Sequence, residues 1–394
     1  MKNRILQTLF TIIFLCIQPF AIASEEQSLR HVESKNCGQC HQQIYEQWQG
    51  SMHAQSTALQ DPIHGAFYQG VIGSPKLEDI KKNGKYPVCL QCHAPTAAKE
   101  GKTKLDSLAV YQEGVNCITC HTLTKFNGTK KAGGGLKLGI SAYEYSDTKL
   151  QGPSVDKVHP SVDGSNQSAS VEMQGNAALL KTNNACLGCH EQRNNSNKVP
   201  LCQTGSEIAS VNNAADCQSC HMPVVNGKRD HSMLGGHSKE MVTQGVLLSL
   251  ASKSKQQLAV TLKNQLPHNF PTGAPFRNVF LRITAYDATG KVAWSNTASH
   301  PIQDDKKSVL MYALGDDEGK PASPPKATQV MYDSRLKPLE LRVIHYELPN
   351  SNIVKVKAEL FYDLLLPALK KKFSEKIPAE LRQSKLIATE EITL

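Results

Sequence analysis

The sequence predicts a mixed fold: a mostly α-helical or irregular N-terminal domain, followed by an all-β domain with immunoglobulin-like sandwich architecture. Two observations support this prediction. All 12 cysteines lie before residue 221, whereas apolar and polar residues alternate in short segments after about residue 241. With 394 residues, the chain is long enough for each domain to bury a core of its own.

Ten of the cysteines occur in five copies of the pattern Cys-x-x-Cys-His, numbered here as motifs one to five along the chain. Their cysteines are Cys37 and Cys40, Cys89 and Cys92, Cys117 and Cys120, Cys186 and Cys189, and Cys217 and Cys220, and their histidines are His41, His93, His121, His190 and His221. Two thiols at this spacing can add to the two vinyl groups on one porphyrin edge, and the adjacent histidine then reaches the iron. The pattern predicts five covalently attached c-type haems (haem iron), each ligated on the proximal side by its motif histidine. Haem would then fill much of the N-terminal core, with only short helices after the motifs.

A single motif of this kind is also compatible with a zinc half-site or a thioredoxin-like dithiol. Five copies argue against both, because paired zinc half-sites would leave one motif unmatched. A disulfide framework is a poor alternative, since such short bridges would barely cross-link a chain of 394 residues. Cys202 is left over. We expect it to be buried as a small apolar residue, with pairing between chains as the alternative.

The N-terminus, over positions 1–23, has the order of a secretory signal peptide. Basic residues at positions 2 and 4 precede an apolar run over positions 5–20, and small residues then suggest cleavage after Ala23. A retained membrane anchor is the alternative, but polar residues interrupt the run. The sequence therefore predicts export to the periplasm, with only peripheral membrane contact. Cys16 is expected to be removed with the signal.

The formal net charge of +9 does not by itself point to a nucleic-acid partner. Removing the signal peptide takes away Lys2 and Arg4 and leaves +7. Each oxidised haem with two histidine ligands adds about −1, from about +1 at the iron core and about −2 on the propionates, so the total falls to about +2. No basic run is punctuated by aromatic residues, and we expect redox proteins rather than nucleic acids as partners.

Nine histidines remain as candidates for the distal side of the five irons. Low-potential electron carriers commonly place a second imidazole there, which closes the iron to substrates. We predict five distal ligands: His53, His159, His231, His237 and His268. His53 follows motif one in a helical stretch, and His268 lies in a proline-bounded turn. His231 and His237 follow motif five closely, and His159 stands alone before a proline.

The other spare histidines are weaker candidates. His64 ranks just behind His159, and His31 lies near the expected mature N-terminus. His300 and His345 fall in the predicted β domain, so we expect them to be structural. Thioether ligation by Met52, Met222 or Met233 is an alternative that would raise a reduction potential, but methionine in such segments more often packs.

Motif spacing and composition suggest a domain organisation. Motifs two and three begin at Cys89 and Cys117, and motifs four and five begin at Cys186 and Cys217, a similar interval in similar surroundings, as in a duplicated two-haem unit. We expect a signal peptide at residues 1–23, a pentahaem domain at 24–240, a β-sandwich at 241–364 and a charged, partly helical tail at 365–394. The Gly-, Ser- and Asn-rich stretch of residues 133–176 is expected to be irregular and exposed.

Several segments around the motifs resemble one known family. Motif one is followed by Ile-Tyr-Glu-Gln-Trp at residues 44–48 and Ser-Met-His-Ala at 51–54, and His-Asn-Phe-Pro-Thr-Gly begins at His268. With residues 217–223, these segments resemble the cytochrome c554-type multihaem c-type cytochrome family over roughly residues 30–275. The resemblance implies close-stacked haems, mostly with two histidine ligands, and periplasmic electron transfer. It also implies distal roles for His53, His231 and His268. A fifth motif and the β domain depart from the four-haem pattern of that family.

Three classes of function follow from these observations. The first is an electron carrier between a quinol-linked or soluble donor and a terminal reductase or outer-membrane conduit. The second is a reductase of a small nitrogen or sulfur oxyanion, which requires one five-coordinate haem with an open distal side. The third is a filament subunit in which a neighbouring chain supplies a distal ligand such as His31. Nine spare histidines favour the carrier.

Overall fold

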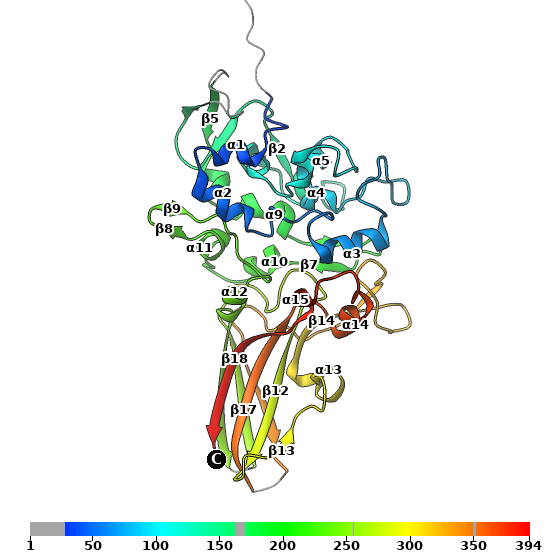
Figure 1. Cartoon of the computed structure of the whole chain (residues 1–394), viewed down its shortest axis with the longest axis vertical. Coiled ribbons are helices and arrows are strands. Elements are labelled where there is room, and N and C mark those ends of the chain that lie inside the picture. The colour runs from blue at the N-terminus through cyan, green and yellow to red at the C-terminus, as the bar shows by residue number, and fades with distance from the viewer. Residues whose placement is uncertain (1–27, 161, 163–169, 255, 350–351) are drawn as a thin grey trace, which may run out of the picture.

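The computed structural model describes residues 28–160, 162, 170–254, 256–349 and 352–394. The predicted signal peptide and Cys16 lie outside these residues. Figure 1 shows a broad region of short helices and loops above a narrow region of long strands. We refer to residues 28–245 as the N-terminal domain and residues 246–394 as the β domain. No helix in the described part of the chain is long and apolar enough to cross a membrane.

The N-terminal domain consists of short elements. Its helices are α1 (Ser34–Gly38), α2 (Gln42–Gln49), α3 (Pro62–Val71), α4 (Leu90–His93), α5 (Pro95–Lys99), α6 (Ala109–Gln112), α7 (Cys117–His121), α8 (Ala177–Leu180), α9 (Asn184–His190), α10 (Thr204–Ala209), α11 (Cys217–His221) and α12 (Lys239–Thr243), with the 3-10 helix η1 (Gly139–Ala142). Its buried apolar side chains form separate small clusters rather than one core. Such a domain is expected where bound groups supply part of the core.

Motifs two to five lie within or at the start of such helices, motif one spans the end of α1 and the turn before α2, and a cap explains two of the helix starts. Asn116 and Asp216 precede motifs three and five, and their side chains accept hydrogen bonds from the main-chain nitrogens of Thr119 and Ser219. Each cap satisfies a main-chain donor that the first helical turn leaves free. The similar surroundings of the two motifs are therefore helix starts of the same kind.

The stretch of residues 133–176 is more regular than the sequence suggested. Its described part contains β2 (Tyr143–Tyr145), β3 (Leu150–Gly152), β4 (Lys157–His159) and β5 (Val171–Gly175). β5 pairs with β3 in parallel and with β4 antiparallel, while β2 pairs with β1 (Leu123–Phe126). These strands are only three to five residues long, too short to show an alternating pattern, which is why composition alone did not reveal them. The remaining short strands are β6 (Arg193–Asn194), β7 (Pro200–Cys202), β8 (Val224–Val225) and β9 (Lys228–Arg229).

The β domain contains two antiparallel sheets. One has the order β10 (Val246–Ser254), β11 (Gln257–Asn264), β16 (Leu341–Glu347). The other has the order β15 (Gln329–Asp333), β14 (Val309–Gly315), β12 (Asn278–Asp287), β17 (Ile353–Asp363), β18 (Lys385–Thr393), with β13 (Val292–Ser295) on β12. The sequence thus correctly predicted a mixed fold of helices and sheets. The immunoglobulin-like assignment stays a prediction.

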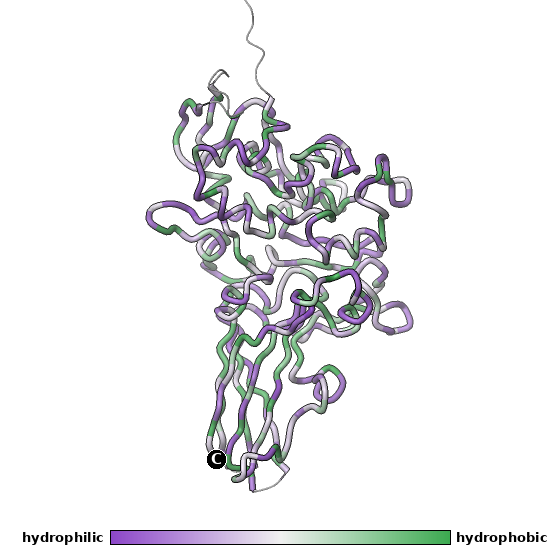
Figure 2. Tube along the Cα trace, in the orientation of Figure 1, coloured by the Kyte–Doolittle hydropathy of each residue, from purple (hydrophilic) through white to green (hydrophobic). Residues whose placement is uncertain are grey.

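Both sheets bury apolar residues in one core. Figure 2 shows hydrophobic and hydrophilic residues interspersed along the long strands of the β domain. Burial alternates along β11, and its inward residues share one core cluster with those of β12 and β17. Since successive side chains of a strand point to opposite faces, each strand turns its apolar set to the core and its polar set outward.

Residues 365–394 were expected to form a partly helical tail, but they also contribute a strand to a sheet of the β domain. They contain α14 (Pro367–Lys372) and α15 (Ala379–Arg382), but β18 then pairs antiparallel with β17 and extends the sheet. Only Ile387 of β18 is buried, and charged residues occupy much of the strand. The weak alternation explains why pattern reasoning missed it.

The two domains share a core. Ile63 and Ala66 of α3 belong to the same apolar cluster as the strands of both sheets. Phe67, also on α3, stacks on Phe276 with ring centres 4.9 Å apart and meets Phe373 edge-on at 5.2 Å. Helix α3 therefore fixes the N-terminal domain on the end of the β domain (Figure 1).

Candidate haem centres

Each of the five motif histidines lies near a second histidine from elsewhere in the chain. Ring centres are 6.0 Å apart for His41 and His159, 6.1 Å for His190 and His53, 6.5 Å for His221 and His268, and 4.0 Å for His93 and His64. The fifth, His121, lies within electrostatic reach of His231 and also of His159. The structure thus brings together four of the five predicted distal histidines with motif histidines.

Three of these separations match what an iron between two imidazoles requires. A first-row metal lies about 2 Å from a ligating imidazole nitrogen, and the ring centre lies about 1 Å behind it, so two rings on one iron have centres about 6 Å apart. The pairs of motifs one, four and five have this spacing. The pair of motif two, at 4.0 Å, is too close, so one of its rings must move outward to admit an iron.

The histidines are also oriented as metal ligands. In seven of them the Nδ1 atom lies 2.6–3.0 Å from a main-chain carbonyl oxygen; these are His64, His93, His121, His159, His221, His231 and His268. An Nδ1–H that donates to a carbonyl fixes the tautomer and leaves the lone pair on Nε2, the nitrogen that binds haem iron. His300 does the opposite, because its Nδ1 accepts from the main chain of Ile302 at the start of α13 (Pro301–Asp304).

His64 carries the clearest sign of a missing partner. Its Nε2 atom is buried without a hydrogen-bond partner, and its Nδ1 shares the carbonyl of Ser56 with His93. A buried polar atom of this kind calls for a bound group. Burial lowers the pKa of His64 to about 4, and it does the same for His53 and His190. These rings are therefore neutral at physiological pH, the form that binds a metal.

The structure does not place His237 beside a motif histidine. The segment after motif five runs to the β domain, where the carbonyl of His237 accepts from Lys385 at 2.6 Å. Burial lowers the pKa of His237 to about 4, and the charges of Arg277 and Lys385 add to the effect. At the neighbouring Gly236, a Cβ atom would lie 2.5 Å from the Tyr362 hydroxyl. Close packing on β17 keeps this segment away from the motifs, which proximity to motif five in sequence does not reveal.

The other sequence candidates have ordinary roles. Nε2 of His31 lies 2.8 Å from a carboxylate oxygen of Glu100, and His345 is exposed on β16. Met233 Sδ lies 2.7 Å from Nδ1 of His53, so it contacts the nitrogen opposite to Nε2. Cys202 is half-buried on β7, and its Sγ contacts the Thr204 hydroxyl at 3.7 Å.

Thiols of different motifs lie in contact, which shows how the motifs are arranged. Side-chain contacts join Cys37 of motif one to Cys117 of motif three, Cys92 of motif two to Cys189 of motif four, and Cys186 of motif four to Cys217 of motif five. Cys120 of motif three also lies within electrostatic reach of both cysteines of motif four. Motif four is therefore central, and motifs one, two and five are peripheral within the described structure.

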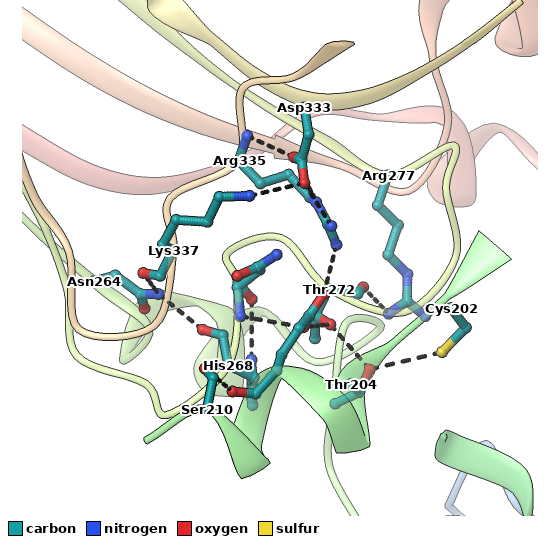
Figure 3. A network of polar contacts seen from close by, with 12 residues as sticks. Cys202, Thr204, Ser210, Asn264, His268, Thr272, Arg277, Asp333, Arg335 and Lys337 are labelled. Atoms are coloured by element: carbon teal, nitrogen blue, oxygen red, sulfur yellow. Dashed lines mark hydrogen bonds and ion pairs between the residues drawn. The ribbon is translucent and has the colours of Figure 1, made fainter. Parts of the chain in front are cut away.

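A buried polar network supports the loop that carries His268 (Figure 3). Glu207 on α10 accepts hydrogen bonds from the Asn269 main chain at 3.2 Å and from the Thr272 hydroxyl at 2.6 Å. It also pairs with Arg335 at 2.9 Å, and the two side chains are only 6% and 8% exposed. The network therefore ties the N-terminal domain to the residues that directly follow His268.

Further contacts complete this network. Arg335 also pairs with Asp333 at 2.9 Å, and Asp333 in turn pairs with Lys337 at 3.0 Å. Burial acts to lower the pKa of Arg335, but Asp333 and Glu207 outweigh it and raise that pKa. Asn264 donates to the carbonyl of His268 at 2.8 Å. The position of His268 thus depends on groups from both domains (Figure 3).

Comparisons with known proteins agree with this geometry. The family described as cytochrome c554 and c-prime matches residues 36–122. The crystal structure of a penta-heme cytochrome c552 from Thermochromatium tepidum is 44% identical, with 93% of this chain and 100% of that chain covered and a TM-score of 0.87. A Bacteroides uniformis beta-glucuronidase 2 covers 30% of this chain and 11% of its own at 12% identity, and its TM-score of 0.13 carries no argument. No curated protein matches the chain.

Proposed function

Because the chain belongs to the multihaem c-type cytochrome family and carries five c-type haems, we propose that it is a periplasmic electron carrier between a respiratory donor and a terminal acceptor. The family predicted from the motifs is confirmed, and electron transfer through haem is its function. The periplasmic location rests on the signal peptide predicted from residues 1–23. The donor would be quinol-linked or soluble, and the acceptor a terminal reductase or an outer-membrane conduit.

The proposal assigns a role to each site residue. The cysteines that would form the thioether bonds are Cys37, Cys40, Cys89, Cys92, Cys117, Cys120, Cys186, Cys189, Cys217 and Cys220. The proximal ligands would be His41, His93, His121, His190 and His221. The distal ligands are then His159, His64, His231, His53 and His268, in the order of the motifs. This set replaces His237 by His64 relative to the sequence prediction.

The observation that best supports the carrier function is that each motif histidine lies near a second histidine. Each bound haem supplies an iron that takes up and releases one electron. An iron with two imidazoles has no open position for a substrate. The chain's own contribution is to hold the imidazoles of His53 and His64 neutral through burial, and to orient rings such as those of His121 and His231 through Nδ1 hydrogen bonds.

The contacts between motifs support an order of electron transfer. Motif one touches motif three, motif three lies beside motif four, and motif four touches motifs two and five. We propose that, with haems bound, motif four would hold its haem beside those of motifs two, three and five, where it would serve as the junction for electron transfer. The peripheral haems of motifs one, two and five are then the points where electrons enter or leave.

A reductase of a small nitrogen or sulfur oxyanion is the second candidate, and one observation favours motif two as its site. The rings of His64 and His93 are closer than a shared iron allows, so one of them must move. If His64 moved away from the iron, that haem would be five-coordinate and open. The choice between carrier and reductase therefore depends on His64.

Electron paramagnetic resonance of the oxidised holoprotein tests the assignment. We expect low-spin signals alone, unchanged by nitrite, hydroxylamine or cyanide. His64→Ala should convert one of the five haems to a high-spin, ligand-binding form. The matched control is His237→Ala, because His237 is similarly buried with a pKa of about 4 yet lies away from the motifs, and it should leave all signals unchanged. A high-spin component in the unmodified protein that shifts with nitrite would instead show one open haem and favour the reductase.

We also propose that the β domain is an immunoglobulin-like sandwich. The support is that its two antiparallel sheets face each other across one shared core.

A further inference from the structure

We propose that a lysine-rich lobe beside motif two is the docking surface for an acidic one-electron carrier protein. The lobe consists of residues 74–88, between α3 and α4, and residues 102–106, and it is called the lysine lobe below. This inference rests on the proposed electron-carrier function and adds the chemical nature of one redox partner. The loop after α3 projects from the side of the N-terminal domain (Figure 1).

Hydrogen bonds hold the two segments of the lysine lobe together. The main-chain nitrogen of Leu105 donates to the Pro75 carbonyl at 2.8 Å, and the Thr103 hydroxyl donates to the Leu77 carbonyl at 3.0 Å. Tyr86 donates from its hydroxyl to the Lys102 carbonyl at 2.7 Å. The loop is therefore anchored at several points, and its side chains present a defined surface.

The lysine lobe concentrates positive charge. It contains Lys76, Lys81, Lys82, Lys85, Lys102 and Lys104, against Glu78, Asp79 and Asp106. Its net charge of +3 is a third of the +9 carried by the whole chain. All six lysines except Lys104 are exposed, and Lys104 is the only one with an ion pair to a described residue, Asp106 at 3.0 Å. Five ammonium groups thus remain available to an anionic partner.

Apolar side chains accompany these charges. Leu77 is 57% exposed and Val88 is 47% exposed, which is high for large aliphatic residues. Transient protein interfaces commonly combine apolar contacts with a charged rim that guides the approach of the partner. Exposed leucine and valine favour a protein over a free anion or a nucleic acid, because neither of those would bury them.

The lysine lobe also lies where an electron must pass. Val88 directly precedes Cys89 of motif two, and Tyr86 and Cys89 pack on the same apolar cluster. Among the described residues, motif two reaches another motif through the contact of Cys92 with Cys189 of motif four. A partner on the lysine lobe would therefore meet a peripheral haem that leads directly to the junction of the array.

Stopped-flow reduction of the oxidised holoprotein by flavodoxin hydroquinone, an acidic one-electron protein, tests the proposal. The test variant is Lys81→Glu with Lys82→Glu. The matched control is Lys253→Glu with Lys291→Glu, which changes the net charge equally on exposed residues of the C-terminal part of β10 and of the β12–β13 turn, at the far end of the β domain. At low ionic strength we expect the test variant to slow the second-order reduction about 10-fold or more, and the control less than about twofold. Salt should erase the difference, because it screens exposed charges.

Several outcomes would overturn the docking site without touching the carrier function. One is an equal change of the reduction rate in the two variants, and another is a reduction rate that salt does not change. The third is a test variant that loses binding to anionic vesicles but is reduced by flavodoxin as fast as the unmodified protein. Dithionite must reduce all five haems in each variant to the same extent, which separates docking from haem competence. Failure of the carrier function would instead appear as a high-spin, ligand-binding haem in the unmodified protein. That result does not depend on the reduction rate of the lysine variants.

Discussion

Replacing Arg335 by methionine should destabilise the protein strongly, because it leaves a buried carboxylate without its cation. Glu207 is only 6% exposed and would keep its hydrogen bonds from Thr272 and Asn269 but lose its ion pair. Removing one partner of a buried pair typically costs about 3–5 kcal/mol, and the two remaining hydrogen bonds place this site at the lower end, at about 3 kcal/mol. Arg335 also lies over the Tyr312 ring at 4.7 Å, and methionine keeps some of that apolar contact.

Guanidinium unfolding followed by circular dichroism measures this loss. The control is Arg30→Met, since the pair of Arg30 with Asp147 is largely exposed and should contribute less than about 1 kcal/mol. The double variant Arg335→Met with Glu207→Gln removes both charges and should recover much of the loss, because glutamine can still accept from Thr272. The reasoning fails if Arg335→Met is as stable as Arg30→Met, or if the double variant is less stable than Arg335→Met alone.

The same substitution has a spectroscopic consequence. Glu207 holds Asn269 and Thr272, which follow His268 closely in the same loop. A loosened loop should alter the low-spin signal of one haem, that of motif five, whereas Arg30→Met should leave every signal in place. An unchanged spectrum in a destabilised Arg335→Met protein would show that the network stabilises the domain contact without positioning His268.

Two further predictions concern local structure and pH. Asp216→Ala removes the cap of α11 and should cost about 1 kcal/mol, measured as a lower unfolding midpoint, while Asp216→Asn should be nearly neutral because asparagine caps equally well. Burial acts to raise the pKa of Asp333, but Arg335 and Lys337 outweigh it and hold that pKa below its usual range. Its contribution to stability is therefore complete above the unfolded-state pKa of about 4 and is lost as the pH falls through the lower folded value. Asp333→Asn should flatten this acid dependence, and an unaltered pH profile would contradict the assignment.

The sequence was most informative where chemistry is local. Attachment of haem needs two thiols and a histidine within one pentapeptide, so the motifs could be read directly, and family and cofactor were confirmed. The alternation of apolar and polar residues after about residue 241 likewise predicted strands, and in β17 the residues Val356, Ala358 and Leu360 are fully buried. In both cases the signal lies within a few neighbouring residues, at a spacing set by covalent geometry or by the pleat of a strand.

Distal ligands are harder to predict because only the fold brings them to the motifs. His64 is far from His93 in sequence and lies on an ordinary helix, capped by Asp61, so nothing nearby in sequence marks it. His237 is closer in sequence to its nearest motif histidine, His221, yet its segment packs on β17 and β18. Distance along the chain is therefore a poor guide to which histidine faces which haem. The distance between two histidine rings in the fold is a better one, but it requires the structure.

The boundary expected at residue 240 separates a segment with haem-attachment motifs from a segment with alternating apolar and polar residues. It does not separate two domains that pack independently. His268 lies well beyond that boundary, between β11 and β12, and faces His221 of motif five across the domain contact. Glu207 reaches the same loop from the N-terminal domain, and residues of α3 share the apolar core of the β domain. Since a haem in motif five would take one axial ligand from each side of this contact, its reduction potential should respond to how the domains are packed. On the proposed assignment, the β domain would therefore be part of the redox array, because His268 would supply a ligand for one of the five irons.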